Sequence, residues 1–163
     1  MEKWGVRTNL AHRGICDVQP TLIGKTATVQ NSMIYNGCMV EGEVRNSILF
    51  PGVHVKQGAV VDSSVLFFNN KIEENCRLNK VVADVGSIFG AGTCVGPIRG
   101  ERAGAVQARD GQNPREPGMA GAVTVIGWNN RIPAATVIGE GAAINPHLLP
   151  EQWKQKVAAG EVL

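Results

Sequence analysis

Aliphatic residues recur at every sixth position along much of the chain. The clearest series lies near the C-terminal end, where four isoleucines stand six residues apart: Ile126, Ile132, Ile138 and Ile144. A small or compact polar residue follows each of the first three isoleucines four positions later, at Asn130, Thr136 and Ala142. A period of six fits neither an amphipathic helix nor the strict alternation of a half-buried strand. The pattern therefore predicts a coil of very short strands and tight corners, with the aliphatic side chains pointing inward.

The same pattern runs from about residue 22 to residue 95, with slips. It places a compact residue four positions after an aliphatic one at Ile23 and Ala27, Ile34 and Cys38, Leu49 and Val53, Val55 and Ala59, Leu66 and Asn70, Ile72 and Cys76, and Val82 and Gly86. Because little room exists beside an inward aliphatic side chain, we expect Cys38 and Cys76 to be small core residues. Cys94 is expected to be similar.

A longer period is superimposed on the hexads. Four related phrases end at Ile34, Leu49, Leu66 and Val82, which are 15, 17 and 16 residues apart (34 to 49, 49 to 66 and 66 to 82). Three full hexads would span 18 residues, so one corner in each turn is shortened and each turn is a three-sided coil. Such coils bury their aliphatic residues only by stacking on neighbours, which makes their stability cooperative along the stack.

Segments outside the repeat complete the expected organisation. Residues 1–19 show no repeat and are predicted to be a linker or a segment packed on the coil. The β-helix is expected over residues 20–149. A long loop rich in glycine, proline and charge interrupts it at 97–121, and loops of that length are usually functional or disordered.

The segment 150–163 is predicted to be a helical cap. Pro150 suits the first position of a helix and Gly160 suits its end, so a short helix is expected over 150–159. Trp153 and Val157 are four residues apart and would lie on the last coil, where they would cover an otherwise open edge.

Composition narrows the class of protein further. The net charge of +2 gives no strong field toward nucleic acid or a membrane surface, and neither is expected as a partner. No apolar run approaches the roughly 18 residues of a membrane span. The four cysteines are widely spaced without a CxxC pair, which is typical of a reduced, cytoplasmic protein.

An ordered series of motifs, NS…GC…NS…LF…GA…CRL, runs from Asn31 to Gly96. The stretches that carry it are NSMIYNGCMVEGEVRNSILFPGVHVKQGAVVDSSVLF and KIEENCRLNKVVADVGSIFGAGTCVG. This order resembles the C-terminal domain of bacterial glucose-1-phosphate adenylyltransferase (ADP-glucose pyrophosphorylase). The resemblance implies an all-β fold, a single-stranded left-handed parallel β-helix of hexapeptide repeats, whereas the spacing alone shows no hand.

The resemblance also implies a division of labour. The family joins ATP and glucose 1-phosphate into ADP-glucose and pyrophosphate for glycogen synthesis, but a separate N-terminal domain performs this chemistry. That domain supplies a Gly-rich phosphate loop and carboxylates for Mg²⁺. We recognise neither motif here, so we expect no catalytic residues and no cofactor in this chain. The chain would then be an excised C-terminal domain or a natural partial homologue that is inactive alone, while the parent enzyme uses Mg²⁺ and ATP.

In the family, the coil packs on its own N-terminal catalytic domain, joins subunits of a homo-oligomer and helps to bind a sugar-phosphate effector through basic residues. The candidates for effector binding here are Arg99, Arg102, Arg109 and Arg115, because guanidinium groups bind phosphate in a bidentate manner. The family carries a shorter charged segment with paired arginines at this place, and no pair here aligns cleanly. Three acidic residues offset the arginines, so a solvated loop is the alternative.

Two other functions stay open. A stand-alone hexapeptide acyltransferase would use acyl-CoA in a trimer cleft, with His54 as general base, since strand alternation points His54 outward. Zinc would need about three convergent ligands, and His12, His54 and His147 lie in the start, the coil and the tail, so no metal site is expected. The other alternative is a non-catalytic scaffold. One of Phe67 and Phe68 is expected on an outer face, where it would suit an interface.

Overall fold

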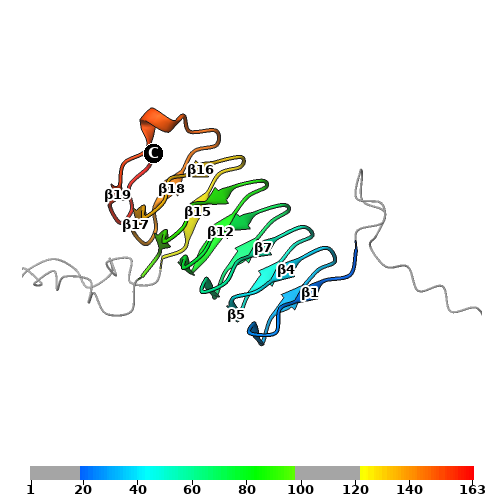
Figure 1. Ribbon diagram of the computed structural model, residues 1–163. Helices are drawn as coiled ribbons and strands as arrows, with labels where there is room; N and C mark the ends of the chain where they lie inside the picture. Colours follow the sequence, from blue (N-terminus) through cyan, green and yellow to red (C-terminus); the bar gives the residue numbers. More distant parts are fainter. Residues whose placement is uncertain (1–18, 98–121) are drawn as a thin grey trace, which may run out of the picture.

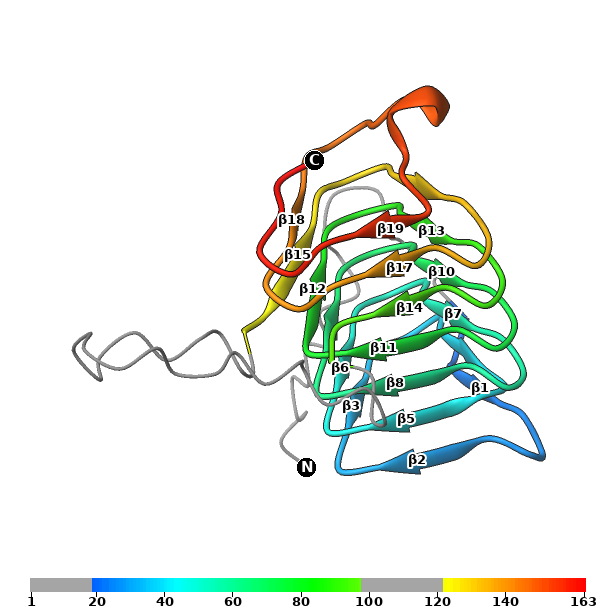
Figure 2. The same ribbon diagram turned by 90° about the vertical axis from the view of Figure 1, so that its left-hand side faces the viewer.

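A computed structural model describes residues 19–97 and 122–163, and these residues form a parallel β-solenoid (Figure 1). Nineteen strands of two or three residues build three parallel sheets, which form the three walls of the stack (Figure 2). Six coils contribute one strand to each sheet, and the last segment adds one further strand. The predicted all-β parallel coil is therefore confirmed, and its hand stays a prediction.

The first sheet contains β1 (Leu22–Ile23), β4 (Met39–Val40), β7 (His54–Val55), β10 (Lys71–Ile72), β13 (Ile88–Phe89) and β16 (Arg131–Ile132). The second sheet contains β2 (Thr28–Gln30), β5 (Glu43–Arg45), β8 (Val60–Asp62), β11 (Arg77–Asn79), β14 (Cys94–Val95), β17 (Val137–Ile138) and β19 (Lys156–Val157). The third sheet contains β3 (Met33–Ile34), β6 (Ile48–Leu49), β9 (Val65–Leu66), β12 (Val81–Ala83), β15 (Thr124–Ile126) and β18 (Ala143–Ile144).

The six-residue repeat supplies the interior of the stack. The four isoleucines of the C-terminal series are between 0% and 3% exposed. The compact positions between them are buried too, and Asn130 satisfies its side-chain amide by donating to the carbonyl oxygens of Gly127 and Asn145, both at 2.9 Å. Each buried aliphatic side chain contributes roughly 1.5–3 kcal/mol. At the first coil, Ile23 is 51% exposed because no described coil packs below it.

A ladder of hydroxyl groups holds the corner between the second and third sheets. The amide of Ser47 donates to Ser32 Oγ, that of Ser64 donates to Ser47 Oγ, and that of Val81 donates to Ser64 Oγ, each at 3.1 Å. Asn31 and Asn46, which precede two of these residues, adopt φ angles of 44° and 49°. Asparagine tolerates this left-handed region better than most residues, so the NS phrases are the sequence signature of this corner.

One predicted register is wrong by a single residue. Leu66 pairs with Ala83 rather than Val82, and Val82 points outward. The interior positions that follow are therefore Ser87 and Phe89, so the compact position is Ser87 and not the predicted Gly86. The pattern could not separate the registers because Val81, Val82 and Ala83 all suit an interior. A slip of one residue exchanges the faces of a strand.

The same slip corrects the expectation for Cys94. Thr93 takes the buried compact position and donates from Oγ1 to the carbonyl oxygen of Gly90 at 2.6 Å. Cys94 is half-exposed on the outer face of the second sheet. Cys38 and Cys76 are buried, as the repeat predicts.

The prediction of a helix over 150–159 is wrong. A single 3-10 turn, η1 (Pro150–Gln152), is followed by strand β19, which pairs with β17. The amide of Gly139 donates to the carbonyl oxygen of Val157 at 2.9 Å, as one of the bonds between the two strands. Strand pairing thus satisfies backbone groups at the sheet edge while Val157 stays buried.

Candidate ligand-binding and interaction surfaces

The effector-binding residues predicted from the sequence, Arg99, Arg102, Arg109 and Arg115, lie outside the described residues. His12 and Cys16 also lie outside the described part of the chain.

The two described histidines lie far apart in the chain and face different neighbours. His54 on β7 is half-exposed between Met39 and Lys71 of the adjacent strands, and its outward direction agrees with the strand alternation. His147 contacts Trp128 edge-on, with ring centroids 4.0 Å apart. Within the described residues, no group of three or more His, Cys, Asp and Glu side chains could hold a metal ion.

A polar pocket of about 290 Å³ opens on the outer face of the second sheet. Its polar lining comes from Arg45, Asp62, Arg77 and Asn79, and its apolar lining includes Val60, Val95 and Pro97. Arg45 Nη1 lies 3.3 Å from Glu43 Oε1, and Nη2 lies 3.9 Å from Asp62 Oδ2. The Nε of Arg45 is buried without a hydrogen-bond partner, so this guanidinium retains an unused donor.

Strand register brings these residues together. Arg45, Asp62 and Asn79 are Cα partners on β5, β8 and β11. They are 17 residues apart (45 to 62 and 62 to 79), which is one coil. The sequence therefore carried a signal for this pocket, a spacing of one coil between outward polar residues, which our interpretation of the sequence missed. Two guanidinium groups and an amide suit a phosphate or carboxylate, and Asp62 offsets part of the positive charge.

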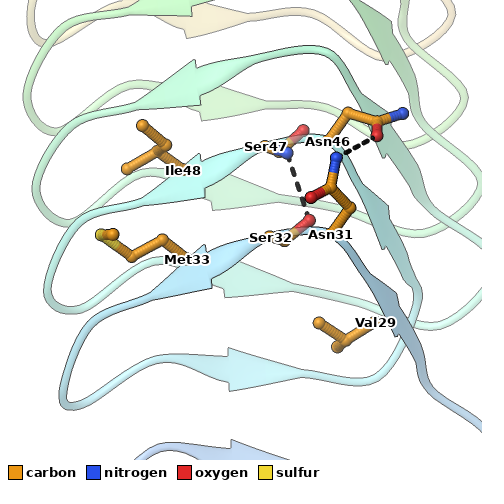
Figure 3. A pocket seen from close by; sticks show the side chains of 7 residues that line it. All are labelled: Val29, Asn31, Ser32, Met33, Asn46, Ser47 and Ile48. Atoms are coloured by element: carbon orange, nitrogen blue, oxygen red, sulfur yellow. Dashed lines mark hydrogen bonds between the residues drawn. The ribbon is translucent and has the colours of Figure 1, made fainter.

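A second hollow, of about 610 Å³, lies at the start of the third sheet (Figure 3). Its polar residues satisfy one another: Asn31 Nδ2 donates to Asn46 Oδ1 at 2.9 Å, and the Ser47 amide donates to Ser32. Met33 and Ile48 project side by side from neighbouring strands in this view. The hollow therefore offers apolar side chains rather than free polar groups, which suits a contact with another apolar surface.

Aromatic rings stack along the corner where the third sheet leads into the first. The ring centroids of Tyr35 and Phe50 are 5.2 Å apart, and those of Phe50 and Phe67 are 4.8 Å apart. The ring centroid of Phe68 lies 5.3 Å from that of Phe50. Neither Phe67 nor Phe68 is buried. The corner therefore carries a continuous aromatic ridge beside the outer face of the third sheet.

Buried thiols and surface ion pairs account for the clear pKa shifts. Burial raises the pKa of the Cys76 thiol to about 11, and its Sγ donates to the carbonyl oxygen of Gly90 at 3.1 Å. Burial raises the pKa of Cys38 as well. Hydrogen bonds to Glu73 and Glu74 raise the pKa of Lys56. None of these groups lines the polar pocket of the second sheet.

The stacked two- and three-residue strands, with their compact corner residues, define the class of the protein: it is a hexapeptide-repeat β-solenoid domain. A family model, GlmU-like, C-terminal hexapeptide, matches residues 20–105. The chain belongs to this family. In the described residues, no helix is long and apolar enough to cross a membrane.

Relatives of known name extend the comparison. The chain is 36% identical over 122 residues to a glucose-1-phosphate adenylyltransferase of Desulfitobacterium hafniense, which covers 75% of this chain and 27% of that protein. It is 32% identical over 132 residues to the enzyme of the same name from Acetivibrio thermocellus, covering 80% of this chain and 29% of that protein. The chain is thus homologous to the C-terminal part of these enzymes and spans less than a third of their length.

Among solved structures, the acetyltransferase domain of PglB from Neisseria gonorrhoeae FA1090 is similar at 15% sequence identity with a TM-score of 0.36. That match covers 93% of this chain and 52% of the other.

Proposed function

We propose that this chain is the C-terminal assembly and regulatory module of a glucose-1-phosphate adenylyltransferase, which makes ADP-glucose and pyrophosphate from ATP and glucose 1-phosphate in glycogen synthesis. The similarity to two such enzymes over at least three-quarters of the chain carries the proposal. The chemistry, with its Mg²⁺ and ATP, belongs to the larger part of those enzymes that this chain does not match. The module packs on that catalytic part and joins subunits.

A chimera tests this function directly. The matching C-terminal part of the Desulfitobacterium hafniense relative is replaced by this chain, and ADP-glucose formation is measured. We expect the chimera to regain the assembly and activity that the relative loses when it is truncated before the matched segment. A folded chimera that behaves like the truncated relative would contradict the proposal. Pyrophosphate release by this chain alone, from ATP and glucose 1-phosphate, would contradict the division of labour.

The regulatory part of the proposal concerns a phosphorylated sugar. The pocket of Arg45 and Arg77 on the second sheet supports it, because guanidinium groups bind phosphate oxygens. The four arginines predicted from the sequence follow soon after Pro97, which lines the same pocket. We propose that the effector phosphate is held between this pocket and those arginines.

Thermal shift with fructose 1,6-bisphosphate tests the effector site. We expect the sugar bisphosphate to raise the melting temperature of the chain, and Arg77→Gln to reduce that rise. Arg131→Gln is the matched control, because Arg131 is an outward arginine on the first sheet. An equal loss in both variants, or no shift in the unsubstituted chain, would contradict the effector proposal. A response to acetyl-CoA alone would favour the acyltransferase alternative.

A further inference from the structure

A row of apolar side chains crosses the whole outer face of the third sheet. Each of its six strands contributes one residue, and the strand register aligns them as Met33, Ile48, Val65, Val82, Val125 and Ala143. Met33 is 55% exposed, Ile48 37% and Val125 47%, and the other three are half-buried. We call these six residues the apolar row. In Figure 2, the labelled strands of this sheet form one side of the stack.

The other two walls lack such a row. The corresponding outward positions of the first sheet include His54, Lys71 and Arg131. Those of the second sheet include charged residues as well, such as Glu43 and Arg77. Among the described residues, the third sheet thus carries the one aligned outward row without an ionisable side chain. A contiguous exposed apolar surface of this kind usually marks an interaction site.

The apolar row has a gradient of side-chain size. The large residues Met33 and Ile48 lie at the N-terminal end of the stack, and Ala143 lies at the other end. The flanking row, two residues further along each strand, repeats the gradient: Tyr35, Phe50 and Phe67 lie at the N-terminal end, and Asp84, Gly127 and Asn145 lie at the C-terminal end. A face with large side chains at one end of the stack and small side chains at the other is complementary in shape to a second copy whose stack runs in the opposite direction.

One two-fold arrangement uses this complementarity. A two-fold axis parallel to the strands, between β9 and β12, would bring the faces together with the stacks antiparallel. It would place Met33 against the partner's Ala143, Ile48 against the partner's Val125, and Val65 against the partner's Val82. Phe50 would lie opposite the partner's Gly127. A two-fold axis along the stack would instead oppose large residues at one end and small residues at the other.

We propose that the third sheet is a self-association surface, on which a second copy of this chain packs face to face with its stack antiparallel. This inference rests on the proposed assembly function and names its surface. The row is about 24 Å long, because neighbouring strands lie about 4.8 Å apart. Its footprint is on the order of 400 Å², about half of what each partner buries in an interface of standard size. The dimer is therefore weak, with a dissociation constant in the range of about 10–100 µM.

Sedimentation of the full chain over a range of concentrations tests the dimer. We expect the mass to rise toward twice 17.3 kDa. Ile48→Glu and Val82→Glu are each expected to raise the dissociation constant at least about 10-fold, since each places two charges at the symmetric contact. Ile88→Glu, an outward isoleucine on the first sheet, is the matched control and is expected to leave it unchanged. A chain that stays monomeric up to about 1 mM, or a dimer weakened only by Ile88→Glu, overturns the proposal.

Cysteine cross-linking tests the antiparallel geometry in a chain carrying Cys16→Ser and Cys94→Ser. A mixture of the Met33→Cys variant and the Ala143→Cys variant is expected to form disulfide-linked heterodimers, whereas Met33→Cys alone is not. Efficient cross-linking by Met33→Cys alone overturns the antiparallel arrangement. An active chimera with a monomeric bare chain overturns this inference alone, and an inert chimera with a dimeric bare chain overturns the proposed function alone.

Discussion

At the scale of single residues, the corners of the coil place the strictest demands on the sequence. Gly96 has a φ of +88°, and a Cβ added there would lie 1.9 Å from the backbone oxygen of Asn79 in the coil below. Gly92 has a similar φ of +72°, but an added Cβ would meet nothing within 4 Å. Substituting each glycine by alanine therefore distinguishes two energetic costs. Gly92→Ala measures the cost of the left-handed backbone conformation alone, and Gly96→Ala adds the cost of a contact with the neighbouring coil.

We expect Gly92→Ala to lower the free energy of unfolding by about 1–2 kcal/mol, the cost of a left-handed conformation with a Cβ. Gly96→Ala adds a backbone clash that requires the coils to separate, so we expect a loss of at least about 3 kcal/mol. Urea denaturation of both variants measures the difference. Equal losses of unfolding free energy in the two variants would mean that the backbone at Asn79 moves away from the added Cβ at little cost.

The cysteines differ in burial and are therefore expected to differ in reactivity. In a Cys16→Ser chain at pH 8, iodoacetamide should label the half-exposed Cys94 and spare Cys38 and Cys76, whose thiol pKa values are raised by burial. Peptide mapping by mass spectrometry reads the result, and the urea-denatured chain is the control in which all three are labelled. Similar labelling rates in the native chain would contradict the assigned register around Cys94.

The same burial predicts a pH dependence of stability. The folded state holds the Cys76 proton with a pKa of about 11, above the ordinary thiol value of 9.0, because burial disfavours the thiolate. The resulting contribution to stability is complete below pH 9 and is lost as the pH rises from 9 toward 11. We expect the urea midpoint to fall over this range, and to fall less in a Cys76→Ala variant. Parallel curves for both chains would contradict this assignment.

At the scale of elements, most strands have only two residues, so a strand has no stability without its neighbours. β19 is the terminal example, because it pairs on one side with β17 and buries Val157 against the end of the core. Lys156, the preceding residue of the same strand, points outward and is exposed. The segment predicted to be a helix thus closes the stack by extending a sheet.

We expect Val157→Asp to destabilise the protein by about 3–5 kcal/mol, because it buries a charge without a partner. Lys156→Asp changes the exposed neighbour to the same residue, and we expect it to change stability by less than about 1 kcal/mol. Thermal unfolding followed by circular dichroism compares the two. If both variants lose the same stability, β19 does not belong to the cooperative stack.

At the scale of the whole molecule, the coils repeat so closely that an uninterrupted corner in one coil shows where the corresponding corner of the next coil is interrupted. Val81 pairs with Thr124, so Lys80 corresponds to Val123. Leu78 pairs with Val95, so Asn79 corresponds to Gly96. The coil of β10, β11 and β12 passes directly from Asn79 to Lys80. At the same corner, the coil of β13, β14 and β15 reaches Val123 only after an insertion of residues 97–122.

Deleting residues 97–122 should therefore leave the solenoid folded. The join from Gly96 to Val123 places Val123 at the position of Lys80 in the coil before it, where φ is 53°. Loop length itself has a small effect, so we expect the free energy of unfolding to fall by about 1–2 kcal/mol, the cost of this left-handed conformation for a residue with a Cβ. The same deletion removes the four candidate arginines, so the thermal shift with fructose 1,6-bisphosphate should disappear. Loss of the folded coil would contradict the alignment of the corner, and an unchanged ligand shift would contradict the role of the arginines.

The sequence by itself determined the coil, because a six-residue period of Ile, Val and Leu can be buried only in a stack of short strands. It also predicted the outward direction of His54 and the burial of Cys38 and Cys76, since those follow from local alternation. It did not determine the register after Leu66, where Val81, Val82 and Ala83 fit either face, and Cys94 was misplaced for the same reason.

Only the tertiary structure decided which distant residues share a surface. The pairing of Arg45, Asp62 and Asn79, and the alignment of the apolar row across six strands, depend on corner lengths that vary from coil to coil. The tertiary structure also decided that Val157 lies in a strand. The local preference of 150–159 for a helix is weaker than the gain in stability from pairing with an open sheet edge. A repeat specifies its own interior, whereas the order of residues on its outer walls is fixed only when the coils are stacked.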